Sequence, residues 1–179
     1  PSIDTQLVAL AKTLGSAEAS AVERQYALPW LIHLTGDVHQ PLHTTVRLTA
    51  TGKWDKLGSG LTVINPFNPH KGSSTLHEFW DDLPGPSSLR GERLESASLA
   101  LIASQPRPKR SVSTDHWVEE SWKIARESGY PDSASQEEMP VLSEAFFERS
   151  KAIADRRVSE AGYRLADLLN TLFKARKRD

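Results

Sequence analysis

Apolar residues recur at intervals of three and four positions through most of the chain, a spacing that predicts helices rather than strands. In the first stretch Ile3, Leu7, Leu10 and Leu14 share one helical face, Gly15 marks its end, and Ser16 offers an N-cap for the next helix. Further helices are predicted over about residues 17–37, 76–83, 88–103, 114–127 and 140–174. No alternating strand pattern persists for long, so the sequence predicts an all-α, multi-helix fold.

One stretch, from Thr44 to Ser74, departs from this pattern. Glycine and proline are frequent in it, and residues 61–64 form a short run rich in β-branched side chains. The composition predicts a long irregular loop with a small hairpin around residues 46–64. A loop of this length inside a compact domain is uncommon and is often functional.

Composition excludes only a few classes of fold and function. A chain of 179 residues suits a single domain, residues 1–179, and its net charge of -1 argues against a broad basic surface for coating nucleic acid. The absence of cysteine excludes disulfides, thiolate metal sites and cysteine nucleophiles. No apolar run reaches the roughly 18–20 residues of a membrane span, and no signal peptide is recognisable at Pro1.

The candidate chemistry lies in histidines spaced with aspartates. His33 and Asp37, and again His77 and Asp81, are four positions apart on predicted helices, so each pair projects from one helical face. A proline turn after the first pair lets His43 reach the same place. One such pair is commonly a surface ion pair, but two pairs and a third histidine favour a metal site. Imidazole and carboxylate donors suit zinc rather than calcium, and we expect all five side chains to converge on one cleft.

Two motifs carry a resemblance to a known family. H-x-x-x-D-x-H-Q-P-L-H at positions 33–43, followed by L-H-x-x-W-D at positions 76–81, resembles the signature of zinc-dependent single-strand-specific nucleases. These type I nucleases, also called 3′-nucleotidases, are similar in fold and metal site to zinc-dependent phospholipase C. W-V-E-E-S at 117–121 and A-G-Y-R-L-A-D-L-L-N at 161–170 are similar to two further helices of the family. The resemblance implies a phospholipase C/nuclease-like fold in which this chain is the C-terminal part of the catalytic domain.

The resemblance also assigns roles to the five candidate ligands. His33 would bind one zinc of a close pair, and Asp37, the implied catalytic aspartate, would bridge that pair. His43, His77 and Asp81 would hold a separate zinc. The complete family site contains up to three zinc ions.

Three other residues are candidates for supporting roles. His39 stands at a position from which it could orient a metal ligand by hydrogen bonding, and a buried structural histidine is the alternative. Trp54 and Phe67, in the irregular loop, could form a wall on which an unpaired base stacks, with core packing as the alternative.

The sequence departs from the family pattern at two places. An N-terminal tryptophan, a nearby histidine, and a later aspartate and histidine complete the close zinc pair in the family, and none of them is present here. We therefore expect one well-formed zinc set and little phosphodiesterase activity from this chain by itself, with a chain extended upstream being active. The family's D-x-G-G-N turn corresponds to Asp55–Gly60, where the asparagine is absent.

The implied activity is hydrolysis of a phosphodiester by metal-activated water, which gives 5′-phosphate products. The implied substrates are single-stranded DNA or RNA and 3′-nucleotides, and the implied location is secreted or periplasmic. Two alternatives stay open: a phospholipase C-like lipid phosphodiesterase, and a truncated, non-catalytic zinc-binding chain. The sequence gives no signal for an oligomeric state.

Overall fold

The computed structural model describes residues 2–48, 52–86, 88–110, 113–132 and 139–175. The elements follow one another as α1 (Ile3–Gly15), α2 (Ala21–His39), the 3-10 helix η1 (Pro41–Thr44), β1 (Thr62–Ile64), β2 (Ser73–Thr75), α3 (Leu76–Asp82), α4 (Gly91–Ser104), α5 (Thr114–Ser128) and α6 (Glu144–Ala175). The two strands form one small antiparallel sheet. The predicted all-α fold is confirmed.

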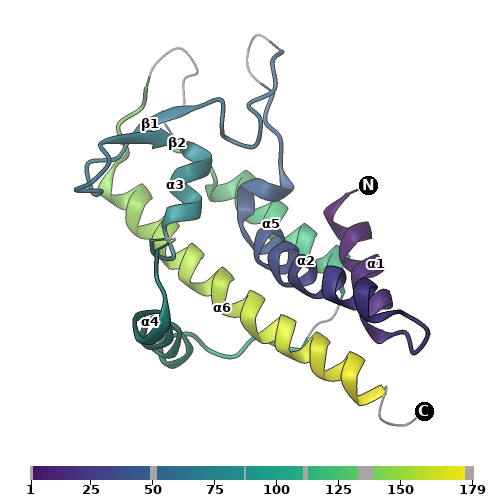
Figure 1. Ribbon diagram of the computed structural model, residues 1–179. Coiled ribbons are helices and arrows are strands. Elements are labelled where there is room, and N and C mark those ends of the chain that lie inside the picture. The colour runs from purple at the N-terminus through teal and green to yellow at the C-terminus, as the bar shows by residue number, and fades with distance from the viewer. Residues whose placement is uncertain (1, 49–51, 87, 111–112, 133–138, 176–179) are drawn as a thin grey trace.

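The longest helix, α6, runs diagonally through the molecule (Figure 1). Helices α1, α2 and α5 pack together along its C-terminal half, while α3 and the hairpin lie near its N-terminal half. Helix α4 lies apart from both groups and contacts α6. Within the described residues, no helix is long and apolar enough to cross a membrane.

Two hydrophobic clusters stabilise this arrangement. The first joins α3, the hairpin and the start of α6, and its buried members are Leu42, Leu61, Val63, Leu76, Phe79, Trp80, Leu83, Leu142, Phe146 and Ala154. The second joins α1, α2, α5 and the end of α6, and its buried members are Leu7, Leu10, Leu14, Ala27, Leu31, Val38, Trp117 and Leu168. Val38 of α2 and Leu42 of η1 belong to different clusters, so the end of α2 and the turn that follows it connect the two cores.

Helix α2 begins later than the sequence pattern predicts. The predicted start near residue 17, with Ser16 as the N-cap, is wrong: the cap is Ser20, whose hydroxyl accepts a hydrogen bond from the Glu23 amide. The Glu23 carboxylate accepts in return from the Ser20 amide at 2.7 Å. This reciprocal capping box satisfies two amide donors at once, which a cap at Ser16 would not do.

The hairpin also differs from the prediction. β1 falls inside the predicted 46–64 region, but its partner β2 lies beyond it. Residues 140–142, predicted as the start of the last helix, instead extend the sheet: the Ile64 amide donates to the Pro140 carbonyl and the Leu142 amide to the Ile64 carbonyl, both at 2.9 Å. Their backbone groups are therefore used by the edge of β1, and α6 starts at Glu144.

Candidate metal centre

Neighbouring contacts connect the five predicted ligands one to the next. From α2, His33 Nε2 lies 3.2 Å from Asp37 Oδ2, as their four-residue spacing requires. The same oxygen lies 3.7 Å from Nδ1 of His43, which η1 carries back past the end of α2. The His43 ring stacks on His77 of α3 with ring centroids 4.8 Å apart, and His77 is in turn paired with Asp81. Successive contacts thus link His33 to Asp81, 48 positions away, through Asp37 and His43.

Three of these side chains form a set suited to one ion. His43 Nε2 lies 3.6 Å from Asp81 Oδ1, and His77 Nε2 lies 3.4 Å from Asp81 Oδ2. All three donor atoms lie within 4.8 Å of one another. Ligands about 2.0–2.2 Å from a tetrahedral zinc are about 3.3 Å apart, so both histidine–aspartate distances are close to what zinc needs. Among the described residues this is the one group of three such side chains.

Hydrogen bonds fix the orientation of the Asp81 carboxylate. Gln40 Nε2 donates to Asp81 Oδ1 at 2.9 Å, while Gln40 Oε1 accepts from the Leu42 amide and so caps η1. Burial raises the pKa of Asp81, but hydrogen bonds from His43 and Gln40 outweigh it and leave that pKa below its usual range. Sequence reasoning missed Gln40, although its place between His39 and Pro41 is the N-cap of the turn that carries His43.

A backbone carbonyl fixes the orientation of His77. His77 Nδ1 donates to the Leu57 carbonyl at 2.8 Å, since a carbonyl can only accept. The hydrogen therefore resides on Nδ1, and Nε2 keeps its lone pair toward Asp81. Lys56, Leu57 and Gly58 all have positive φ, at 52°, 61° and 85°, a conformation that is strained for the first two. This left-handed run aims the Leu57 carbonyl at the imidazole.

Hydrogen bonds to Asp55 fix the loop that carries Leu57. The buried Asp55 accepts hydrogen bonds from the Arg47 amide at 3.0 Å and from the Tyr130 hydroxyl. Burial and the hydrogen bond to Asp55 both raise the pKa of Tyr130, so its hydroxyl stays protonated and donates. The contact links the loop to the end of α5, 75 positions away.

Replacing Gly58 by alanine should loosen this support. A Cβ atom there would meet Leu42 Cδ1 at 2.7 Å and the His77 amide nitrogen at 3.3 Å, at a φ that L-residues rarely adopt. We expect a loss of about 1–3 kcal/mol of unfolding free energy, measured by urea denaturation. Gly72→Ala is the control, because nothing lies within 4 Å of a Cβ at that position. Equal stability of the two variants would contradict the strain argument.

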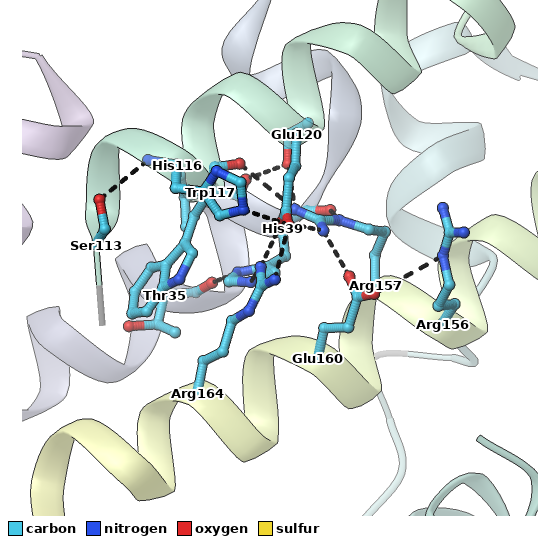
Figure 2. Close-up of polar contacts among 12 residues, drawn as sticks. Thr35, His39, Ser113, His116, Trp117, Glu120, Arg156, Arg157, Glu160 and Arg164 are labelled. Carbon is cyan, nitrogen blue, oxygen red and sulfur yellow. Dashed lines mark hydrogen bonds and ion pairs between the residues drawn. The ribbon is translucent and has the colours of Figure 1, made fainter. Parts of the chain in front are cut away.

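His39, two residues after Asp37, is buried in a polar network (Figure 2). Its Nδ1 donates to the Thr35 carbonyl at 2.7 Å, and its Nε2 accepts from Arg164 at 2.9 Å. Burial, reinforced by the charge of Arg157, lowers the pKa of His39 to about 3, so the ring is neutral near pH 7. These two bonds use both ring nitrogens, and neither partner is one of the predicted metal ligands.

Glu120 of α5 lies at the centre of the same network (Figure 2). It accepts from Arg157 at 2.9 Å, from Arg164 at 2.6 and 2.9 Å, and pairs with His116 at 3.1 Å. Burial raises the pKa of Glu120, but the hydrogen bonds from Arg164 and Arg157 outweigh it and lower that pKa to about 2. The carboxylate therefore stays ionised and balances two buried guanidinium groups.

The two aromatic residues predicted to stack on a base, Trp54 and Phe67, lie in different environments. Trp54 is 68% exposed, and its backbone forms an isolated bridge with Leu48. Phe67 is 36% exposed and stacks on Phe147 with ring centroids 4.8 Å apart. Both rings of the Phe67–Phe147 pair line a separate cavity of about 180 Å³ that Lys151 also borders.

A second cavity, also of about 180 Å³, adjoins the candidate metal ligands. Asp37, His43 and Asp81 line one side of it, and Val158 and Arg157 of α6 line another. The ligand atoms are thus accessible from a hollow large enough for a small group, with walls that are mostly apolar.

The chain is similar in sequence to a known protein family and to several plant endonucleases. A family model described as S1/P1 Nuclease matches residues 2–174. Endonuclease 5 of Arabidopsis thaliana is 27% identical over 168 residues, which cover 85% of this chain and 52% of that protein. Endonuclease 3 of the same plant is 25% identical over 166 residues, covering 85% of this chain and 53% of that protein. The chain spans about half the length of the curated relatives it matches.

Proposed function

Because this chain belongs to the S1/P1 nuclease family, we propose that it contributes a zinc site to a hydrolase that cleaves the phosphodiester bonds of single-stranded DNA or RNA. The observation that supports this most directly is the convergence of His43, His77 and Asp81 with donor spacing near that of tetrahedral zinc. Zinc, when bound, acidifies a bound water and neutralises charge on a phosphoryl group. We propose 5′-phosphate products and 3′-nucleotides as further substrates.

The residues around the ion would prepare its ligands. With an ion on Nε2 of His43, the ring hydrogen would reside on Nδ1, which lies 3.7 Å from Asp37 Oδ2. The Leu57 carbonyl accepts the corresponding hydrogen of His77. Asp37, which is only partly exposed, keeps a second oxygen that could accept a proton from the attacking water, and this is the catalytic role we assign to it. His33, beside it, would complete a second metal position together with donors outside this group.

Substrate contacts are proposed for the exposed aromatic rings of the irregular segment. Phe67, which is 36% exposed and stacked on Phe147, offers a ring face for an unpaired base at the edge of the cavity that both rings line. Trp54 offers a more exposed ring with less support. We also propose a secreted or periplasmic location on the basis of the family.

The test is zinc-dependent hydrolysis. A labelled single-stranded oligonucleotide, the matching duplex and a phosphatidylcholine analogue should be incubated with the purified chain, with zinc or with EDTA. We expect chelator-sensitive cleavage of the single strand, slow for residues 1–179 because one three-ligand set lies among the described residues, and no release from the lipid analogue. Cleavage that EDTA leaves unchanged, or a preference for the lipid, would contradict the proposal.

A further inference from the structure

The last carbonyls of α2 have unusual partners. A helix leaves its final carbonyl groups without intrahelical donors, so they must be satisfied from outside. Here the Ser121 hydroxyl donates to the Val38 carbonyl at 2.6 Å, and Arg157 Nε donates to the His39 carbonyl at 3.3 Å. Arg157 Nη2 also donates to Ser121 Oγ at 2.7 Å, so one guanidinium holds both carbonyls, directly and through the hydroxyl.

These contacts hold the end of α2, where a small movement of the backbone would displace Asp37 and His43. Ser121 is 0% exposed and Arg157 3% exposed, at the junction between the two hydrophobic clusters. The chain leaves α2 directly after His39 and carries His43 in the next turn, while Asp37 stands one residue before Val38. Arg157 also lines the cavity that Asp37 and His43 border. Figure 2 shows Arg157 reaching from α6 toward the end of α2.

We propose that Arg157 and Ser121 are positioning residues that fix the end of α2, so that His43, beside Asp37, faces Asp81 in a geometry ready for the ion. The inference rests on the proposed zinc site and names two residues that act on it without touching the ion. Their contacts link α5 and α6 to the ligand-bearing turn, across 83 and 118 positions of sequence.

Stability alone accounts poorly for an arginine at this position. Burying a guanidinium is costly even when it is paired, as Arg157 is with Glu120 and Glu160, and an apolar side chain of similar volume often serves a core equally well. An apolar residue cannot donate to a carbonyl. The planar fork of arginine, with several donors in fixed directions, can hold a backbone carbonyl and a hydroxyl at the same time.

Arg164 provides a matched comparison. It comes from the same helix, is 4% exposed, and is also paired with Glu120, but its described bond to α2 goes to the His39 ring rather than to the α2 backbone. If the network only stabilises the core, Arg157→Met and Arg164→Met should affect the metal alike. If Arg157 positions the ligands, its replacement should be selectively harmful to metal binding.

The experiment measures zinc affinity by competition with a chromophoric chelator, for the 179-residue chain and its variants, at a temperature where circular dichroism shows each one folded. We expect Arg157→Met to raise the zinc dissociation constant about 10–100-fold, as is typical when a group that orients a ligand is lost. Ser121→Ala should raise it by a smaller factor. Arg164→Met should leave it within about threefold of wild type. With Co²⁺ in place of zinc, the ligand-field absorption of Arg157→Met should also change in intensity, because it reports coordination geometry.

The outcomes separate this inference from the proposed function. Equal zinc affinity and an unchanged Co²⁺ spectrum in wild type, Arg157→Met and Ser121→Ala would overturn the positioning role and leave the zinc site intact. Equal weakening by Arg157→Met and Arg164→Met would overturn it too, in favour of a general effect on the core. A wild-type chain that binds no zinc would overturn both proposals. Should Arg157→Met fail to fold, Ser121→Ala and Arg157→Lys decide the question, and weakened affinity in both is the supporting result.

Discussion

Replacing His77 by alanine is expected to abolish tight zinc binding by this chain. His77 supplies one of three donors, its Nε2 is directed by the bond from Nδ1 to Leu57, and it faces Asp81 at 3.4 Å. Loss of a residue that merely orients a ligand typically weakens metal binding 10–100-fold, so loss of the ligand itself should cost at least ~100-fold. Zinc titration followed by competition with a chelator measures the change. Any zinc-dependent cleavage of single-stranded DNA should fall by at least the same factor.

Two other histidines make this result specific. His70→Ala is the control, because His70 is exposed and lies outside the ligand group. His33→Ala should leave the tightest zinc affinity within about threefold of wild type, since the His33 side chain is 61% exposed and outside the group of three. If His33→Ala weakened zinc binding as much as His77→Ala, the ion would lie between His33 and Asp37, and our assignment of the ligands would be wrong.

The second large effect concerns folding stability. Glu120→Gln should lower the free energy of unfolding by about 2–3 kcal/mol near pH 7, because the neutral side chain leaves the buried Arg164 without its counter-charge, whereas Arg157 keeps Glu160. The figure lies below the usual range for a fully buried pair, since Glu120 is 28% exposed and solvent screens part of the interaction. Urea denaturation measures it. Glu119→Gln is the control: Glu119 is exposed and paired with Lys123, and its loss should change stability by less than about 0.5 kcal/mol.

The pH dependence gives an independent check on Glu120. Its pKa is lowered from 4.5 to about 2 in the folded protein, so the ionised carboxylate stabilises the fold. This contribution is fully present above the unfolded value of 4.5 and is lost as the pH falls through that value toward about 2. The stability difference between wild type and Glu120→Gln should therefore shrink across this acid range. A difference that stays constant down to pH 2 would show that Glu120 acts by packing rather than by charge.

The periodicity and spacing of residues along the sequence determined the local structure of this protein, namely which side chains share a helical face. The apolar repeat of α1 gives the buried face that its helix presents, because neighbours three and four positions apart on a helix share a side whatever surrounds them. The same rule places His33 beside Asp37 and His77 beside Asp81 whatever the tertiary fold. The resemblance to a nuclease family, carried by these motifs, is confirmed by the family model.

Only the tertiary structure decided how these local units are completed. Four contacts join residues that are far apart in sequence. They are the pairing of β1 with β2, the hydrogen bond from Gln40 to Asp81, the bond from His77 to the Leu57 carbonyl, and the bond from Arg157 to the end of α2. Such contacts depend on which faces pack together and on backbone groups that carry no sequence signal of their own. The cap of α2 shows this on a small scale, since Ser16 and Ser20 are alike as residues and only Ser20 has Glu23 three positions on. A periodic pattern determines which residues share a helical face, and the packing of the two cores determines which of them meet at the candidate metal site.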